Sequence, residues 1–267
     1  MYEEYWGLNK APFDNVPDPN FFFYSEGHEE ALMRLLYAIE RGKGAALLTG
    51  DVGCGKTLIS RSLVRQLEES DEYQIALITN PNTDLLDFLS DILHKMGIEK
   101  KKTNGSKVQL THLLDAEMMN NAETGRNTLI IVDEAHLIED EKTLEELRLL
   151  LNFQLNEKFL LTLVLIGQQE LRKKIAHLSP LDQRIAIRCH LHPLNYDDTI
   201  HYIVHRLKKA GLGKNIFKED AMEKIYDHTK GIPRMINTVC DLSLLAGVST
   251  ESEEIDSDIV QCVIDEM

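Results

Sequence analysis

The sequence predicts an α/β fold: a parallel five-stranded sheet flanked by helices, followed by a smaller, all-helical C-terminal lid domain. Two observations predict it. Short apolar runs of strand length alternate with segments of helical period in the first part of the chain, and this rhythm requires a parallel sheet. Beyond Pro193 the pattern becomes wholly helical. We therefore expect an α/β domain over residues 1–193 and a helical lid over residues 194–267.

Composition sets limits on function. The 267 residues are 43% hydrophobic and 27% charged, which is enough to build a sizeable core. The net charge of −15 weakens any expectation of broad, nonspecific DNA binding. The four cysteines lack the spacing of a metal site or a disulfide framework, which suggests a reducing compartment. The longest apolar run, 159–167, is about half of a membrane span of roughly 20 residues. We expect a cytoplasmic protein that crosses no membrane.

The opening segment, residues 2–24, is rich in aromatic side chains and is interrupted by three prolines, so we expect an irregular strap that includes no helix. Two interpretations stay open. The rings dock the segment on the domain, or the strap borders a nucleotide base. A helix predicted over 28–39 then leads to a buried strand over 45–49.

The stretch after that strand matches the phosphate-binding pattern G-x4-G-K-[ST]. Its glycines allow a tight turn whose N–H groups face an anion, and we expect them to leave room for the phosphates. Lys56 would reach the β- and γ-phosphates, and the Thr57 hydroxyl would bind Mg²⁺. The residues expected to contact a nucleoside triphosphate are Gly50, Asp51, Val52, Gly53, Cys54, Gly55, Lys56, Thr57 and Leu58. We interpret Cys54 as a packing residue.

The next strand is expected over 73–79 and a helix over 84–96. The loop that follows carries Lys100, Lys101, Lys102 and Lys107, before a helix over 108–121. This basic run suits either a solvated loop or a contact with DNA or another acidic partner.

The run LIIVDE over 129–134 predicts a third buried strand that ends in two acids. Asp133 would hold Mg²⁺ through water, and Glu134 would polarise the attacking water. His136 completes the letters DEAH, but the chain is too short for the second motor domain of a helicase. We expect His136 at a helix start beside the acids, in contact with Glu134.

A strand expected over 159–166 ends near Gln168, which either hydrogen-bonds a γ-phosphate or its water or is an exposed turn residue. Arg184 and Arg188 precede a last short strand, where arginines usually form surface ion pairs. Arg234 lies in the first turn of a helix over 233–246, where a cation is disfavoured unless it meets an anion. Four histidines (His190, His192, His201 and His205) form a loose cluster that we interpret as solvated rather than as a zinc site.

Together these residues resemble the AAA+ ATPases, and more narrowly the general secretion pathway protein A type. The matching blocks include TGDVGCGKT, LIIVDEAHL, VLIGQQEL, LDQRIAIR and GIPRMIN, in order along residues 1–246. The resemblance implies that Gln168 is the sensor 1 residue, Arg184 the arginine finger with Arg188 as the alternative, and Arg234 the sensor 2 arginine. It also implies ATP and Mg²⁺ as cofactors, a ring of identical subunits, and a partner in an envelope secretion complex.

The same core resembles transposition-regulating ATPases that load on DNA, so an ATP-controlled DNA-binding regulator is the alternative function. A scaffold that binds nucleotide without hydrolysing it is disfavoured by the intact Glu134. Members of the secretion type continue into a membrane helix and a peptidoglycan-binding part. We therefore expect either a domain cut from a longer protein, held at the inner membrane by a missing segment or a partner, or a free-standing relative.

Overall fold

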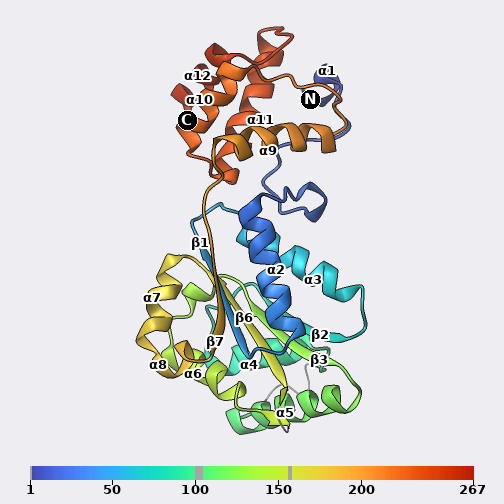
Figure 1. Cartoon of the computed structure of the whole chain (residues 1–267), viewed down its shortest axis with the longest axis vertical. Helices are drawn as coiled ribbons and strands as arrows, with labels where there is room; N and C mark the ends of the chain where they lie inside the picture. Colours follow the sequence, from blue (N-terminus) through green and yellow to red (C-terminus); the bar gives the residue numbers. More distant parts are fainter. Residues whose placement is uncertain (1, 100–104, 156–157) are drawn as a thin grey trace. The chain divides into compact units, whose positions relative to one another are not determined.

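The computed structural model describes residues 2–99, 105–155 and 158–267, which form two compact units (Figure 1). The sheet unit contains Glu29–Gly50 and Ile59–Leu191. The helical unit contains the chain up to His28, the segment Asp51–Leu58 and the segment His192–Met267. The domain boundary predicted at residue 193 stays a prediction.

The sheet unit is built on five parallel strands in the order β2-β3-β6-β1-β7. Their bounds are β1 Ala45–Gly50, β2 Tyr73–Ile78, β3 Asn127–Val132, β6 Leu161–Gly167 and β7 Ile185–Leu191. Strands β1, β3 and β6 are almost wholly buried, which explains why they read as continuous apolar runs. The predicted five-stranded parallel sheet is confirmed.

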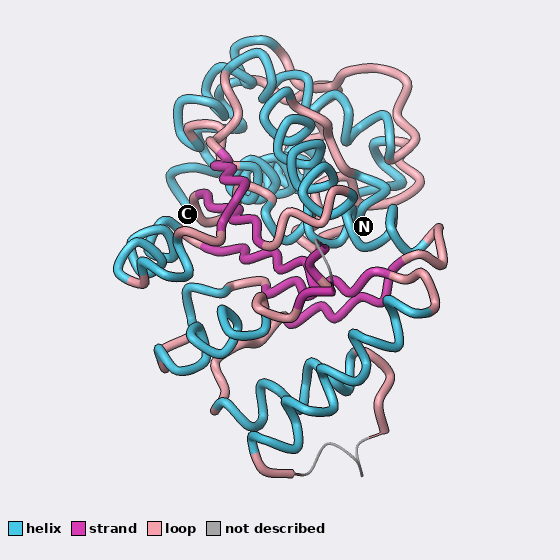
Figure 2. The backbone as a smooth tube through the Cα atoms, turned by 60° about the horizontal axis from the view of Figure 1, so that its bottom comes forward, coloured by secondary structure: helices cyan, strands magenta, loops and turns pink. Residues whose placement is uncertain are grey.

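Helices cover both faces of the strand layer (Figure 2). The flanking helices are α2 Glu26–Glu40, α3 Lys56–Glu68, α4 Leu85–Lys95, α5 Lys107–Glu123, α6 Glu141–Leu150, α7 Gln169–His177 and α8 Ser179–Asp182. One apolar core joins α4 to α8 with alternate strand residues such as Leu47, Ile130 and Leu163. Because neighbouring strand residues face opposite ways, the residues between these, such as Leu48 and Ile131, are buried on the other face.

In the sheet unit, three details differ from the sequence prediction. Phe159 does not belong to β6; it lies in a short antiparallel hairpin formed by β4 (Gln154–Leu155) and β5 (Lys158–Phe159). Arg188 lies inside β7 rather than before it. Helices α7 and α8 were not predicted, because each is short and follows directly on a strand end or another helix.

The helical unit contains α9 Tyr196–Lys209, α10 Glu219–Thr229, α11 Pro233–Ser249 and α12 Ser257–Glu266. Asn195 caps α9, because its side chain accepts a hydrogen bond from the Asp198 amide at 2.7 Å. None of the helices in the described parts of the chain is long and apolar enough to cross a membrane.

The aromatic strap is part of the core of the helical unit. Its rings Tyr2, Trp6, Phe13 and Phe21 are buried among the side chains of α9 to α12. The docking interpretation is confirmed for these rings. Contrary to the prediction, the strap begins with a short helix, α1 Tyr2–Trp6, and contains a single 3-10 turn, η1 Pro19–Phe21, because all three prolines come after α1.

Candidate functional site

The glycine-rich loop connects the end of β1 to the start of α3, the strand–loop–helix context that its motif requires. Gly53 and Gly55 adopt positive φ values of 83° and 94°, a region that side-chain-bearing residues rarely enter. The Lys56 ammonium bends back and donates a hydrogen bond to the Asp51 carbonyl oxygen at 2.8 Å. Lys56 is therefore folded across its own loop, 6% exposed.

Protein neighbours fill the space beside both of these glycines. A Cβ atom on Gly53 would lie 2.9 Å from the Cβ of Arg234 and 3.0 Å from Ile232, and one on Gly55 would lie 2.9 Å from His28 Nε2. The sequence motif predicts glycines here because they leave room for phosphate. The structure adds a second reason, because the loop is packed between the start of α2 and the start of α11.

The loop carbonyl groups are tied to these same neighbours. The Arg234 amide donates to the Gly53 oxygen at 3.3 Å, and His28 Nε2 lies 3.0 Å from the Cys54 oxygen. Among the residues that the structure describes, the Gly53 and Gly55 amides have no hydrogen-bond acceptor. With the Gly53 and Cys54 carbonyl groups engaged and these amides available, the loop can bind an anion. Arg234, predicted to meet a phosphate, lies beside this loop.

Three predicted residues lie at the last position of a strand or directly after it, on neighbouring strands. In the parallel sheet Thr49 pairs with Gly167 and Val132 pairs with Leu165. Gly50, Asp133 and Gln168 therefore all lie at the carboxyl edge of the sheet, the edge at which such folds bind ligands.

Asp133 is 2% exposed and fixed by two donors. Its Oδ1 accepts from the Glu134 amide at 2.9 Å, and its Oδ2 accepts from the Ser60 hydroxyl of α3 at 3.4 Å. The carboxylate is a hard oxygen donor held in one orientation, which suits Mg²⁺.

Glu134 has a left-handed backbone with φ 53°, an unusual conformation for a residue with a side chain. Its Oε2 atom is buried and has no hydrogen-bond partner in the described part of the chain. His136 Nδ1 lies 3.4 Å away, the contact predicted from the sequence. The same Nδ1 also lies 3.4 Å from the Gln168 amide, which can only donate. Because one nitrogen cannot serve both, accepting from Gln168 leaves Glu134 Oε2 free to bind a water.

Lys174 holds the turn that carries these groups. Its ammonium donates to the carbonyl oxygens of His136 at 2.8 Å and Ile138 at 2.6 Å. The turn is the 3-10 helix η3 Ala135–Leu137, and Lys174 comes from α7, which begins directly after Gln168. Helix α7 therefore begins beside Gln168 and, through Lys174, holds the turn that follows Asp133 and Glu134.

Arg184 and Arg188 differ in their partners. Arg188 forms an ion pair with Asp182 at 2.9 Å and donates to two carbonyl oxygens. Arg184 donates only to neutral groups, the Asn152 side chain at 2.7 Å and the Leu151 oxygen at 3.4 Å. Within the described residues Arg184 has no carboxylate partner. The positive charge of Arg188 is neutralised by the Asp182 carboxylate, whereas that of Arg184 is not balanced by a carboxylate within the described residues. An anion from outside the chain could therefore pair with Arg184.

The described histidines and cysteines form no metal site, since no group of three or more possible ligands comes together among the described residues. His192 and His201 are exposed, as predicted. His190 and His205 are only partly exposed, because His190 Nδ1 lies 2.9 Å from the Thr49 hydroxyl and the His205 ring packs on Phe23. Lys107, from the basic run, pairs with the buried Glu146 at 2.5 Å. Lys100, Lys101 and Lys102 lie outside the described residues.

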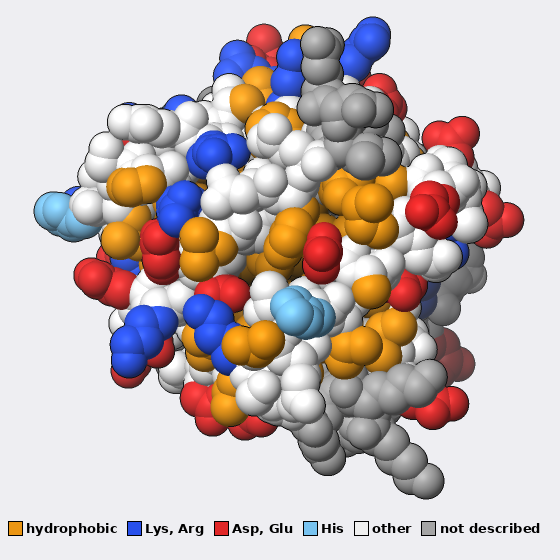
Figure 3. Space-filling model, turned by 90° about the horizontal axis from the view of Figure 1, so that it is seen from below, with side chains coloured by type: hydrophobic (Ala, Val, Ile, Leu, Met, Phe, Trp, Pro, Cys, Tyr) orange, Lys and Arg blue, Asp and Glu red, His pale blue; other side chains and the backbone are white. Residues whose placement is uncertain are grey.

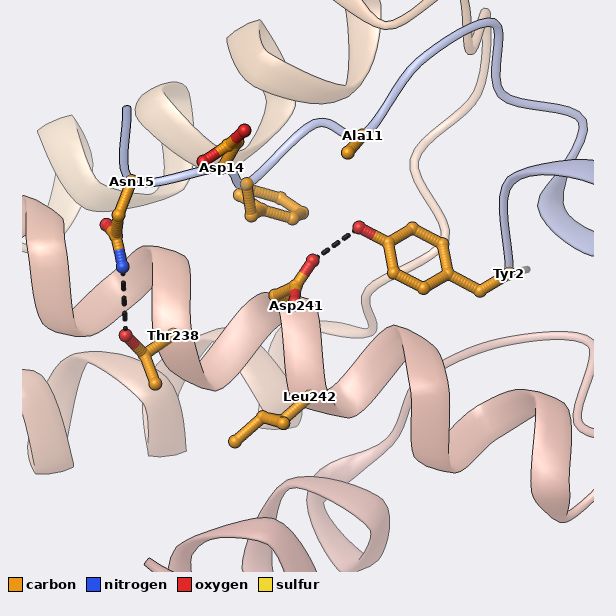
Figure 4. Close-up of a pocket in the computed structure, with 8 residues that line it drawn as sticks. Tyr2, Ala11, Asp14, Asn15, Thr238, Asp241 and Leu242 are labelled. Atoms are coloured by element: carbon orange, nitrogen blue, oxygen red, sulfur yellow. Dashed lines mark hydrogen bonds between the residues drawn. The ribbon is translucent and has the colours of Figure 1, made fainter. Parts of the chain in front are cut away.

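A pocket of ≈ 440 Å³ lies between the strap and α11 (Figure 4). Tyr2 donates to Asp241 and Asn15 donates to Thr238 across it. The lining side chains include Asp14 and Asp241 and no Lys, Arg or His, so this pocket repels phosphate.

Three structurally central residues were not predicted: His28, Lys174 and Arg206. Each acts through a backbone carbonyl group of a segment distant in sequence. Such contacts leave no periodicity or spacing in the sequence.

A family model described as "AAA domain" matches residues 39–175. The chain is 40% identical over 258 residues to general secretion pathway protein A of Aeromonas hydrophila, covering 96% of this chain and 46% of that protein. The chain thus spans about half the length of that relative.

Solved structures agree on the fold. The Aeropyrum pernix ORC2 protein superposes with a TM-score of 0.73 at 19% identity, over 97% of this chain and 72% of that one. Cdc6p from Pyrobaculum aerophilum superposes with a TM-score of 0.75 at 17% identity, over 96% and 70%. With the family model matching half of its length, this chain belongs to the AAA family of ATPases.

Proposed function

We propose that this chain binds ATP with Mg²⁺ and hydrolyses it to ADP and phosphate. The observation that carries the proposal is the buried Oε2 of Glu134, which accepts no hydrogen bond within the described chain although His136 Nδ1 lies 3.4 Å away. It lies at the sheet edge from which the glycine-rich loop also starts. A carboxylate oxygen without a donor is suited to accept a proton from water.

The residues would act as follows. Lys56 exchanges the Asp51 carbonyl group for a phosphate, and the Gly53 and Gly55 amides donate to phosphate oxygens. Thr57, one helical turn before Ser60, and Asp133 are the proposed ligands of Mg²⁺, which would neutralise phosphate charge. Glu134 takes the proton of the attacking water, and Gln168 orients that water or the γ-phosphate.

The arginines are assigned by their partners. Arg234, beside the loop, would donate to the γ-phosphate, and Arg184 would serve a neighbouring subunit of a ring. The absence of a carboxylate beside Arg184, within the described chain, favours it over Arg188.

We further propose that the ring serves assembly of a secretion complex, supported by the name of the relative from Aeromonas hydrophila. The DNA-binding alternative has little support, since Lys107 is paired with Glu146 and acidic and basic side chains are intermixed on the face in Figure 3. Turnover measured with duplex DNA and with peptidoglycan separates the two: stimulation by DNA alone would favour the alternative.

The central test is calorimetric binding of MgATP to the parent and to Lys56→Ala, with Lys173→Ala, an exposed lysine, as control. We expect the loss of Lys56 to weaken binding about 100-fold, because the phosphates lose a charge-assisted donor. Equal affinity of Lys56→Ala and the parent would refute the assignment.

A further inference from the structure

His28 contacts the glycine-rich loop from outside the sequence motif. It lies in the first turn of α2 and is 5% exposed. Its Nε2 is 3.0 Å from the Cys54 carbonyl oxygen, and its Nδ1 is 2.6 Å from the Ser25 hydroxyl. Because a carbonyl oxygen only accepts, Nε2 carries the proton and Nδ1 accepts from Ser25.

The surroundings of the ring keep it in this neutral form. Burial lowers the pKa of His28, outweighing the opposite effects of the Cys54 carbonyl group and the Asp198 carboxylate. The ring of Phe22 stands edge-on to the imidazole with 5.7 Å between centroids. The hydrogen bond to Cys54 is therefore made by a ring that is fixed in position.

That hydrogen bond sets the direction of the next amide. The described chain contains no cis peptide, and in a trans peptide the C=O and N–H groups point in opposite directions. With the Cys54 oxygen turned toward His28, the Gly55 N–H must point away from it. This is one of the amides that find no acceptor among the described residues.

The shape of the loop fits the ring closely. Gly55 has a φ of 94°, and a Cβ atom there would lie 2.9 Å from Nε2. The imidazole thus fills the space beside Gly55 and opposes rotation of the peptide.

We propose that His28 is a positioning residue for the phosphate-binding loop: by holding the Cys54 carbonyl group it aims the Gly55 amide at the nucleotide phosphates. This inference rests on the proposed ATP binding. It makes the strap–α2 junction, through Ser25 and His28, part of the nucleotide site.

The test compares His28→Gln with His28→Asn in calorimetric binding of MgATP. The glutamine amide nitrogen reaches the position of imidazole Nε2, whereas that of asparagine reaches only Nδ1. Both variants lose the ring and its packing. We expect His28→Gln to keep the parent Kd within about threefold and His28→Asn to raise it about tenfold, the loss of one hydrogen bond.

Equal Kd values for the two variants, whether weakened or not, would overturn the inference, because lost ring packing alone affects both alike. A parent that binds no MgATP would overturn the proposed function and the inference with it. If His28→Asn fails to fold, Ser25→Ala replaces it, since it leaves the ring in place but frees Nδ1. We then expect about a threefold rise in Kd, and an unchanged Kd would overturn the inference.

Discussion

At the scale of single residues, the proposed catalytic side chains are oriented by hydrogen bonds that involve backbone groups. Glu134 illustrates this. Its left-handed backbone is stabilised by the Asp133 carboxylate on its amide, and its carbonyl oxygen accepts from the Leu137 amide at 2.9 Å. These two contacts offset the backbone strain of the positive φ. In this conformation the Oε2 atom of Glu134 has no hydrogen-bond donor within the described chain.

Glu134→Gln is expected to bind MgATP with the parent Kd and to hydrolyse it at least about 100-fold more slowly, because an amide keeps the shape but cannot accept a proton. Steady-state phosphate release and calorimetry measure the two quantities. Glu139→Gln, an exposed glutamate after the same turn, is the control. Parent-level turnover in Glu134→Gln would remove Glu134 as the base.

The cysteines are expected to differ in reactivity. Burial raises the pKa of the Cys54 and Cys189 thiols to about 11, and that of buried Cys240 well above its ordinary value, whereas Cys262 is exposed. At pH 8 about one in a thousand of the Cys54 and Cys189 thiols would be ionised. We expect a thiol reagent to label Cys262 rapidly and the others only after unfolding, and Cys262→Ser to abolish the fast phase. Fast labelling of Cys54 would contradict the packing role.

At the scale of elements, Arg206 of α9 ties the strap to the C-terminal helices. It is 5% exposed and donates to the carbonyl oxygens of Pro12 and Asp14 and to the Tyr202 hydroxyl, and its guanidinium lies over the Phe21 ring at 4.8 Å. The guanidinium group of Arg206 thereby satisfies backbone carbonyl groups of the strap, which is an irregular segment and makes no strand pairing among the described residues.

Arg206→Lys is expected to lower the free energy of unfolding by roughly 2–3 kcal/mol, because an ammonium cannot reach all three acceptors and leaves buried oxygens unpaired. Urea unfolding measures the loss, and limited proteolysis should cut residues 7–20 first. Lys209→Met, an exposed change on the same helix, should leave both unchanged. Equal stability of Arg206→Lys and the parent would show that the strap docks through its rings alone.

At the scale of the whole molecule, the two units are interleaved along the chain. The chain passes between them after His28, Gly50, Leu58 and Leu191. The glycine-rich loop therefore belongs to the unit of His28 and Arg234, while the strand before it belongs to the sheet unit. A change in loop conformation would thus act directly on α2 and α11.

Arg184→Ala is expected to bind MgATP normally and to hydrolyse it poorly, because an arginine supplied to a γ-phosphate by a neighbour contributes roughly 10³–10⁵ in rate. That factor equals about 4–7 kcal/mol, far above a surface ion pair. Arg188→Ala, which removes an arginine already paired with Asp182, is the matched control.

Assembly gives the sharper form of this test. Mixing Arg184→Ala with Glu134→Gln subunits should restore turnover, since some interfaces then combine an intact Glu134 with an intact Arg184. Specific activity should also fall on dilution to the monomer. If specific ATPase activity does not change with protein concentration and the mixture of variants stays inactive, Arg184 has no role in a neighbouring subunit's site and is only a surface residue.

The sequence by itself determined the sheet, the glycine-rich loop and the acid pair. These features are local: buried strands read as apolar runs, and a loop that turns around an anion needs glycines at fixed spacing. The strand–loop–helix context, the parallel sheet and the contact of His136 with Glu134 could therefore be predicted.

The tertiary structure decided what surrounds these features. The contact of His28 with Cys54, the contact of Arg234 with Gly53, and the support of the acid turn by Lys174 join residues more than 25 positions apart. Their partners are backbone carbonyl groups, which every residue possesses, so nothing in the sequence singles them out. The choice of Arg184 over Arg188 likewise depended on which guanidinium finds a carboxylate once the chain has folded.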